Sequence, residues 1–355
     1  MVFVGGRLRG HQESREYFAV QAPISSWLHP KPLGLWCEPG QFYIDPRSAV
    51  DRAIITHGHA DHARSGHAHV LATAETVAIM KVRYGEGCAG AFQPLALGEA
   101  LTINGVGVRL APAGHILGSA QVVLDWQGQR AVVSGDYKRA ADPTCQGFEA
   151  VTCDVFVTEA TFALPVFRHE RAEDEARRLM ASMVGQPDRA HLVGVYGLGK
   201  CQRVIKVLRQ AGFDKPIYLH GALVGLTALY QSLGQELGDV RPVVGATPEE
   251  LATALAMCPP SAVGDRWARR FGDPVTVFCS GWMRTRGRVR QTGVELPLVI
   301  SDHADWPELI ATIVETGASE IWVTHGRDDA LVRQMELMGI KARALALVGR
   351  EDEDD

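Results

Sequence analysis

The sequence predicts an α/β protein in which metal-binding side chains gather at one rim of the strands and a second α/β unit interrupts the chain. Two observations carry this prediction. Short apolar runs of strand length repeatedly stop next to a histidine or an acidic residue. Between about residues 165 and 297, strand-like and helical segments alternate, which is typical of a parallel sheet with helical crossovers. The length of 355 residues favours one large domain or two.

The first element of the site is the segment Thr56-His57-Gly58-His59-Ala60-Asp61-His62, which follows an apolar run. Neutral imidazoles and carboxylates are the usual protein ligands of zinc and similar divalent ions. A solvated His-rich loop is the alternative, but such tracts usually lack an interposed aspartate and a preceding strand. We therefore predict a metal site here.

Five further runs end at a candidate group, and loops anchored at strand ends are where precise chemistry is usually held. The run 106–110 leads to His115, 131–133 to Asp136, 155–157 to Glu159, 298–300 to His303, and 321–323 to His325.

The interrupting unit is expected at 165–297, which leaves 1–164 and 298–355 as two halves of one domain. Within it we expect helices at 170–184, 201–210 and 223–237, and strands at 191–195, 216–219 and 274–279. A helix is also expected at 75–82 in the first half. Residues 1 to about 27 show no periodicity and are expected to be poorly ordered.

Composition sets the frame without naming an activity. No apolar run reaches membrane-spanning length, so we expect a soluble, cytoplasmic protein with no membrane partner. The seven cysteines are scattered, which suggests neither a disulfide framework nor a thiolate zinc site. The net charge is −5, but the tail 351–355 supplies five negative charges, so a neutral body can still carry a basic groove. The tail itself is expected to be a disordered, solubilising end.

A family resemblance rests on motifs spread over residues 35–347. In chain order they are Phe42-Tyr43-Ile44-Asp45, His57-x-His59-x-Asp61-His62, Gly114-His115, Ser134-Gly135-Asp136, Thr158-Glu159-Ala160-Thr161, Ser301-Asp302-His303-Ala304-Asp305 and Thr324-His325-Gly326. Their order resembles that of metallo-β-lactamase-fold nucleases with a β-CASP insert. The stretch Leu35-Trp36-Cys37-Glu38-Pro39-Gly40, with residues 42–46, is most similar to the bacterial ligase-associated DNA exonucleases.

This resemblance implies an αββα sandwich with an inserted α/β β-CASP domain and two divalent metal ions. It implies that one ion is held by His57, His59 and His115, the other by Asp61, His62 and His325, with Asp136 between them. Asp45 would lie behind the ligands and orient their loop. Seven such groups exceed what one tetrahedral ion can use, which independently favours a pair. Zinc is the expected metal, and manganese and iron are also compatible with these ligands.

The resemblance also pairs Glu159 with His303 and places His303 at the scissile phosphate, with Asp61 as a further catalytic residue. A histidine so held can donate a proton or stabilise the transition state. The alternative is that Glu159 and His303 are structural strand-end caps. Asp302 and Asp305 are alternative ligands, but neither matches the family position.

Several cations are candidates for binding substrate phosphate. Lys138 and Arg139 follow Asp136, and Lys200 ends Gly194-Val195-Tyr196-Gly197-Leu198-Gly199-Lys200. Cys201 stands where a nucleotide-binding loop needs Ser or Thr, so we exclude nucleoside triphosphate binding. The same backbone suits either a substrate phosphate or a plain tight turn. Arg284, Arg286, Arg288 and Arg290 recur at every second position, so in an extended strand they would form one row, for phosphate or as charge on a solvated edge.

The expected function is a metal-dependent phosphodiesterase, a DNA exonuclease in repair that uses a metal-activated hydroxide. Its expected partners are DNA, as a single strand or a duplex end, and a repair system with a DNA ligase or helicase. An RNA-processing nuclease of the same fold is the first alternative, because the chemistry acts on the phosphate. A small-molecule metallohydrolase and an inactive scaffold are further alternatives; the α/β insert opposes the former and the full ligand set the latter.

Overall fold

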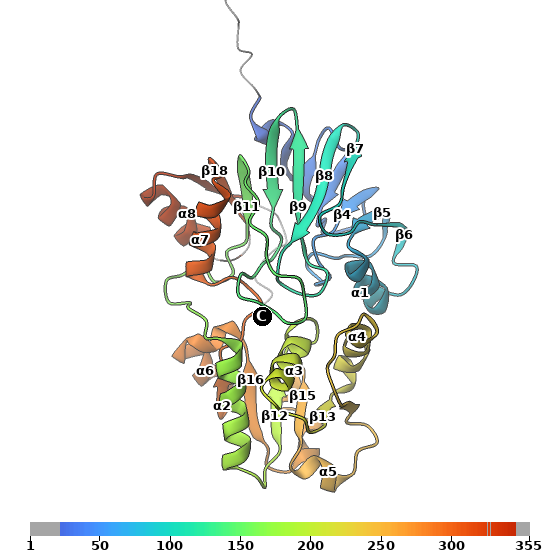
Figure 1. Ribbon diagram of the computed structural model, residues 1–355, viewed down its shortest axis with the longest axis vertical. Helices are drawn as coiled ribbons and strands as arrows, with labels where there is room; N and C mark the ends of the chain where they lie inside the picture. The colour runs from blue at the N-terminus through green and yellow to red at the C-terminus, as the bar shows by residue number, and fades with distance from the viewer. Residues whose placement is uncertain (1–21, 325, 327, 346–355) are drawn as a thin grey trace, which may run out of the picture.

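The computed structural model describes residues 22–324, 326 and 328–345, whose strands form three sheets (Figure 1). In Figure 1 the upper half holds the first two sheets with α1, α7 and α8, and the lower half holds the third sheet with α2 to α6. The α/β class is as expected. Among the described residues, no helix combines the length and hydropathy that crossing a bilayer requires.

The first sheet has six strands in sequential order. They are β1 Leu28–Lys31, β2 Gly34–Cys37, β3 Phe42–Ile44, β4 Arg52–Ile54, β5 His67–Ala72 and β6 Ala89–Pro94. Helix α1 (Ala74–Tyr84) follows β5, begins at the N-cap Thr73 and ends at Gly85. The helix expected at 75–82 is therefore present.

The second sheet has seven strands in the order β19-β18-β11-β10-β9-β8-β7. They are β7 Ala100–Ile103, β8 Val106–Pro112, β9 Ala120–Trp126, β10 Gln129–Val133, β11 Val155–Thr158, β18 Glu320–Val323 and β19 Lys341–Ala344. Strands β8 and β10 are both antiparallel to β9, while β11 is parallel to β10 and β18 to β11. The carboxyl ends of β8, β10, β11 and β18 therefore meet at one edge.

Alternating side chains bury both faces of these two sheets, as the pleat of a strand requires. Ile54 and Trp322 point into the core between the sheets, whereas Ile55 and Val323 belong to outer clusters. Helix α1 covers the outer face of the first sheet. Helices α7 (Trp306–Thr316) and α8 (Asp328–Leu337) cover the outer face of the second.

The third sheet is entirely parallel, in the order β14-β13-β15-β12-β16-β17, and its chain enters after β11 and leaves before β18. Its strands are β12 His191–Gly194, β13 Ile217–Leu219, β14 Val240–Pro242, β15 Leu255–Cys258, β16 Val275–Cys279 and β17 Leu296–Leu298. Its helices are α2 Ala172–Gly185, α3 Lys200–Gln210, α4 Gly221–Ser232, α5 Pro248–Ala252 and α6 Arg286–Thr292. Four short 3-10 turns complete the described chain: η1 Ile24–Ser26, η2 Pro260–Ala262, η3 Arg266–Phe271 and η4 Gly281–Arg284.

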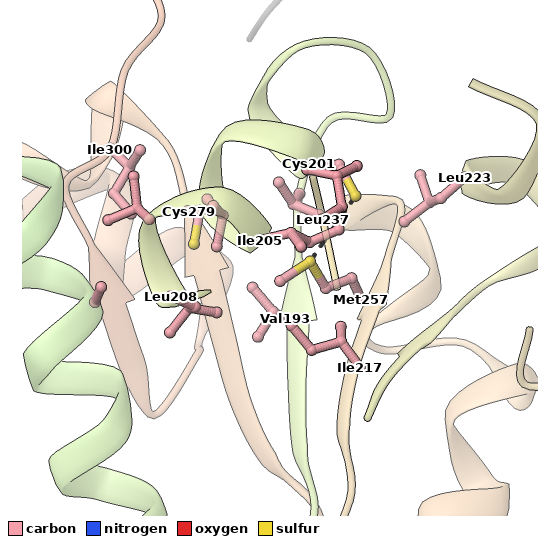
Figure 2. Close-up of a cluster of buried hydrophobic side chains, with 14 of the residues drawn as sticks. Val193, Cys201, Ile205, Leu208, Ile217, Leu223, Leu237, Met257, Cys279 and Ile300 are labelled. Atoms are coloured by element: carbon pink, nitrogen blue, oxygen red, sulfur yellow. Dashed lines mark hydrogen bonds between the residues drawn. The ribbon is translucent and has the colours of Figure 1, made fainter. Parts of the chain in front are cut away.

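Helix α3 packs its apolar side onto this sheet (Figure 2). Cys201, Ile205 and Leu208 lie among core residues that include Val193 and Met257. The sulfur of Cys201 is 3.8 Å from that of Met257, and the residue is fully buried. Cys201 is thus a packing residue of the core.

Three local expectations are wrong. The run 298–300 is not a strand leading to the rim, because β17 ends at Leu298 and pairs with β16 of the third sheet. The arginines do not lie on an extended strand: η4 and α6 are helical, and arginine is a good helix former. Residues 22–27 are structured, because Trp27 is 1% exposed in the core between the first two sheets. Residues 1–21, His325 and the acidic tail lie outside the described residues.

Candidate metal centre

The candidate site lies at the strand ends of the first two sheets. The loop after β4 carries four candidate ligands, His57, His59, Asp61 and His62. Helix α1 holds this loop in place: Arg83 donates to the Gly58 carbonyl at 2.6 Å, and Gly58 lies directly over Ile79. A rigid helix thus sets the position of a segment that has no regular structure of its own.

Ligand atoms from distant parts of the chain come within 4.8 Å of one another in overlapping groups. His57, His59, His115 and Asp136 form one group, and Asp61, His62 and Asp136 form a second. Asp136 follows β10 and His115 follows β8, so the shared edge of the second sheet brings them together. Asp136 belongs to both groups, which is the arrangement expected of a carboxylate between two ions. His325, the remaining predicted ligand, lies outside the described residues.

Asp45 and Thr56 set the tautomers of His62 and His57. The Asp45 carboxylate accepts from Thr56 N–H at 2.8 Å, from Thr56 Oγ1 at 2.6 Å and from His62 Nδ1 at 2.8 Å. Since the Thr56 hydroxyl donates to Asp45, it accepts from His57 Nδ1 at 3.1 Å. Both rings therefore carry their proton on Nδ1 and present an Nε2 lone pair to a metal. Thr56 was not among the predicted site residues.

The other two tautomers are set by main-chain carbonyls. His115 Nδ1 lies 2.8 Å from the Asp302 carbonyl, and His59 Nε2 lies 3.2 Å from the Leu198 carbonyl. A carbonyl can only accept, so His115 presents Nε2 and His59 presents Nδ1. No side-chain pattern in the sequence marks a carbonyl, which is why neither Leu198 nor Asp302 was predicted in this role.

The nitrogens left with lone pairs converge. His59 Nδ1 is 3.2 Å from His57 Nε2 and 3.0 Å from His115 Nε2, while Oδ2 of Asp136 is 3.3 Å from His57 Nε2. Lone pairs brought this close repel unless a cation lies between them. The donor set of three imidazoles and a carboxylate is one that zinc accepts. The residues present therefore fit a bound divalent ion.

Electrostatics keeps the ligands in their metal-binding forms. Burial lowers the pKa of His57 to about 4, and burial also lowers the pKa of His115 well below its ordinary value. Both rings are therefore neutral near neutral pH. Burial opposes ionisation of Asp136, but the neighbouring His62 and His303 hold its pKa well below the usual range. Asp136 is thus a carboxylate.

Glu159 and His303 lie beside this centre. Glu159 Oε2 is 2.9 Å from His303 Nδ1, and its Oε1 accepts from the Tyr137 N–H at 2.8 Å. Both residues are buried, and ligand atoms of Asp136, Glu159 and His303 lie within 4.8 Å of one another. The ring centroids of His303 and His115 are 4.8 Å apart. The structure thus brings the predicted pair together at the edge of the metal site.

The two lysines predicted to bind phosphate already contact other groups of the protein. Lys138 Nζ donates to the His303 carbonyl at 3.3 Å, and Lys200 Nζ lies 3.7 Å from Oδ2 of Asp302. Both side chains are buried. They hold the loop that carries His303, so their ammonium groups are not presented at the surface.

The arginines near the site differ in whether other side chains already contact them. Arg284 pairs with Glu170 at 3.3 Å, and Arg288 stacks over Trp282 at 5.3 Å. Arg286 and Arg290 are exposed on α6. Arg139 is engaged by Glu315, with an N–O distance of 2.6 Å.

Known proteins similar to this chain include a probable DNA ligase from Opitutus terrae, 24% identical over an alignment of 331 residues that covers 88% of this chain and 30% of the ligase. Endoribonuclease YSH1 from Gibberella zeae is 31% identical over 57% of this chain and 29% of its own length. Ribonuclease TTHA0252 from Thermus thermophilus is 27% identical over 54% of this chain and 51% of its own length. The chain thus spans between 29% and 51% of the length of these curated relatives.

A crystal structure of a protein of unknown function from Enterococcus faecalis shares the fold, with a TM-score of 0.51 and 13% identity over 77% of this chain and 74% of that one. No family model matches the chain. The curated relatives confirm the resemblance to β-CASP metallo-β-lactamase nucleases. The match to the probable DNA ligase supports the more specific link to ligase-associated proteins.

Proposed function

We propose that this protein is a metal-dependent phosphodiesterase, a DNA exonuclease of the ligase-associated type. The observation that carries the proposal is the convergence of two ligand groups on the shared carboxylate of Asp136, with the Glu159–His303 pair beside them. Two divalent ions bound there would polarise a water molecule and neutralise the charge that develops on a phosphodiester. The ions proposed are zinc, with manganese or iron as alternatives.

We also propose a two-domain architecture. Helix α1, the first two sheets, and helices α7 and α8 would form the αββα metallo-β-lactamase sandwich, and the third sheet with its helices the β-CASP insert. The insert would span about residues 165–297, with halves of the sandwich on either side. Because β17 pairs within the third sheet, we place the exit of the insert just after Leu298.

Each of this chain's catalytic side chains has a proposed task. Asp61 and Asp136 would bind metal and hold the reacting water in place through their carboxylates. Because Glu159 accepts from Nδ1 of His303, Nε2 is the ring atom that we assign to the scissile phosphate, where it would donate a proton or hydrogen bond. Pairing with a buried carboxylate fixes both the tautomer and the orientation of this ring.

DNA is the proposed substrate because the probable DNA ligase matches 88% of this chain, whereas the two ribonucleases match 57% and 54%. A ligase-containing repair system is the partner proposed on the same ground. An RNA nuclease is the second candidate, favoured by the similarity to those two ribonucleases. Both candidates use the same phosphate chemistry.

The test is digestion of 5′- and 3′-end-labelled DNA and RNA of identical sequence, with zinc, manganese or iron supplied one at a time. We expect metal-dependent loss of terminal DNA nucleotides and little cleavage of RNA. Asp61→Ala and His303→Ala should each lose most activity while remaining folded, and His303→Ala should retain its metal. Asp51→Ala, at a side chain 76% exposed, is the matched control. Preferential RNA cleavage would favour the second candidate, and wild-type activity in either site variant would overturn the role assigned to it.

A further inference from the structure

Two metal-binding histidines are oriented by carbonyls that lie beside the third sheet. The Leu198 carbonyl, which faces His59, lies in the turn before α3, and the Asp302 carbonyl, which accepts from His115, lies in the loop after β17. Neither carbonyl belongs to the first or second sheet, from which the histidine loops come. The orientation of both rings therefore depends on how the end of the third sheet packs against the metal centre.

Arg203 of α3 connects these two carbonyl-bearing segments. Its Nη1 donates to the Ser301 carbonyl and lies 3.4 Å from Oδ1 of Asp302. Its helix begins next to Leu198, and the first-turn bond from Arg203 N–H to the Gly199 carbonyl, at 2.9 Å, is one that any non-proline residue at this position would make. The side chain is only 3% exposed, so no solvent competes for these contacts.

The charge of this arginine is matched locally. Its Nε lies 3.5 Å from Oδ2 of Asp142, and Lys200 Nζ lies 3.7 Å from Oδ2 of Asp302. Two buried cations and two buried carboxylates thus form one cluster between α3 and the loop after β17. Arginine suits this position because its planar fork can contact a carbonyl and a carboxylate at once in fixed geometry.

The backbone at the start of α3 packs closely against the loop that carries His115. Gly199 has a φ of +84°, and a Cβ built there would lie 2.2 Å from Cγ2 of Ile116, the residue after His115. The start of α3 therefore rests directly on the loop that carries this ligand. A shift of the helix would be transmitted to His115 from both sides.

We propose that Arg203 is a positioning residue of the metal centre, whose side chain ties the loop after β17 to α3 and so holds the Asp302 carbonyl where it fixes the tautomer of His115. The proposal rests on the two-metal function proposed above. The effect should be selective, because His115 belongs to the ligand group of His57, His59 and Asp136. Loss of the Arg203 side chain should weaken binding of the ion in that group and leave binding of the ion at Asp61 and His62 unchanged.

The test is metal content per chain in full-length protein dialysed against increasing chelator, with thermal unfolding of the metal-free protein as a second readout. Arg203→Met should lower the affinity for one ion about 10- to 100-fold, the usual effect of removing a residue that orients a ligand, and retain the other. Arg209→Met is the matched control on the same helix. Arg209 donates to carbonyls far from the metal centre, those of Phe213, Lys215, Leu237 and Asp239.

Arg209→Met should lower the unfolding temperature and keep both ions. Retention of both ions by folded Arg203→Met, at wild-type chelator resistance, would overturn the proposal. Equal loss of the same ion in Arg209→Met would overturn it too, because general destabilisation would then explain the effect.

Arg203→Lys decides the matter if the methionine variant does not fold, because it keeps the charge opposite Asp142 and Asp302 but lacks the fork. We expect a smaller loss confined to the same ion, and wild-type affinity for both ions would overturn the proposal. Wild-type protein that binds one ion or none is a separate result: it overturns the two-metal function, and this proposal with it.

Discussion

The hydrogen bonds of Asp45 decide which atoms of the metal centre can bind metal. Asp45 has a φ of +45°, a left-handed conformation in which Asp and Asn are the most tolerated side chains. From there it accepts from Thr56 and from His62 Nδ1. One buried carboxylate therefore fixes His62 directly and His57 through the Thr56 hydroxyl.

Asp45→Asn should lower metal content with little change in fold. An asparagine that keeps its oxygen toward Thr56 N–H presents an NH2 group to His62 Nδ1, which favours the tautomer with the proton on Nε2. That tautomer cannot bind metal through Nε2, so we expect affinity for the ion at Asp61 and His62 to fall about 10- to 100-fold. Elemental analysis after chelator dialysis measures this effect. Asp51→Asn, on an exposed side chain, should be indistinguishable from the wild type.

The buried histidines also give the metal-free protein a defined dependence of stability on pH. Burial lowers the pKa of His57 to about 4, whereas the unfolded chain has a histidine pKa of about 6.5. As the pH falls through this window, the unfolded state takes up a proton that the folded state does not. The free energy of unfolding should therefore fall between about pH 6.5 and about pH 4.

Urea unfolding in the presence of chelator, compared between about pH 7 and about pH 5, measures this slope. His57→Gln should reduce it, and the part that remains should come partly from His115, whose pKa burial also lowers. His69→Gln, at a side chain 61% exposed, should leave it as in the wild type. A wild-type slope in His57→Gln would show that His57 is not held neutral in the folded state.

Residue types predicted which side chains the structure brings together, but not the groups that orient them. His57, His59, His62, His115 and Asp136 could be picked out because few other side chains bind metal. Thr56, Leu198 and the Asp302 carbonyl could not, because a threonine or a backbone carbonyl has no distinctive pattern until the fold brings it to a ring nitrogen.

At the scale of elements, helix α1 fixes the position of the loop that carries His57, His59, Asp61 and His62. Gly58 has no room for a side chain, because a Cβ there would lie 2.5 Å from Cγ2 of Ile79. Gly58→Ala should destabilise the protein by about 1–3 kcal/mol through overpacking and also weaken metal binding. Adding Ile79→Ala should restore part of the lost metal binding by making room. Gly87→Ala, where a Cβ meets nothing within 4 Å, is the control in urea unfolding.

Helix α6 changes how the arginines act together. In a helix, residues four apart share a side, so Arg286 and Arg290 of α6 form one pair. Arg284 at the end of η4 is engaged by Glu170, and Arg288 stacks over Trp282, which leaves Arg286 and Arg290 as the exposed pair. We expect this pair to meet the phosphate backbone of the proposed substrate.

The double variant Arg286→Gln and Arg290→Gln should weaken DNA binding at every sequence. It should also reduce the slope of log affinity against log salt by about 1 for each lost contact. Fluorescence anisotropy over a salt series measures both effects. Arg333→Gln, on the exposed face of α8, is the control. An unchanged salt slope would exclude this helix from the DNA path.

The errors made from sequence are errors of local context. Arginine at alternate positions predicts one row on an extended strand, but the Ser280 side chain caps η4 by accepting from Trp282 N–H, and α6 follows through Thr285. The apolar residues 298–300 predict a strand at the rim because they precede His303, whereas β17 pairs with the preceding strand β16 and so belongs to the third sheet. Strand β15 was missed for a similar reason, since it is recognisable mainly by its place between β12 and β13.

At the scale of the whole molecule, segments adjoining the third sheet pack against the candidate metal centre and contact its histidines. The ligand loops come from the first two sheets, yet the carbonyls at Leu198 and Asp302 that orient two of those ligands adjoin the third. The alternation of strands and helices was enough to predict the third sheet and its helices. Its contribution to metal binding could be seen only once the distances were known.

Counting bound metal shows whether this chain holds a pair of divalent ions in one site. Protein purified without chelator and loaded separately with zinc, manganese or iron should hold about two ions per chain by elemental analysis, as the two ligand groups around Asp136 require. Asp136→Ala should reduce the affinity for both ions, because both groups share that carboxylate. Wild-type protein that saturates at one ion or none under every loading condition would contradict the account.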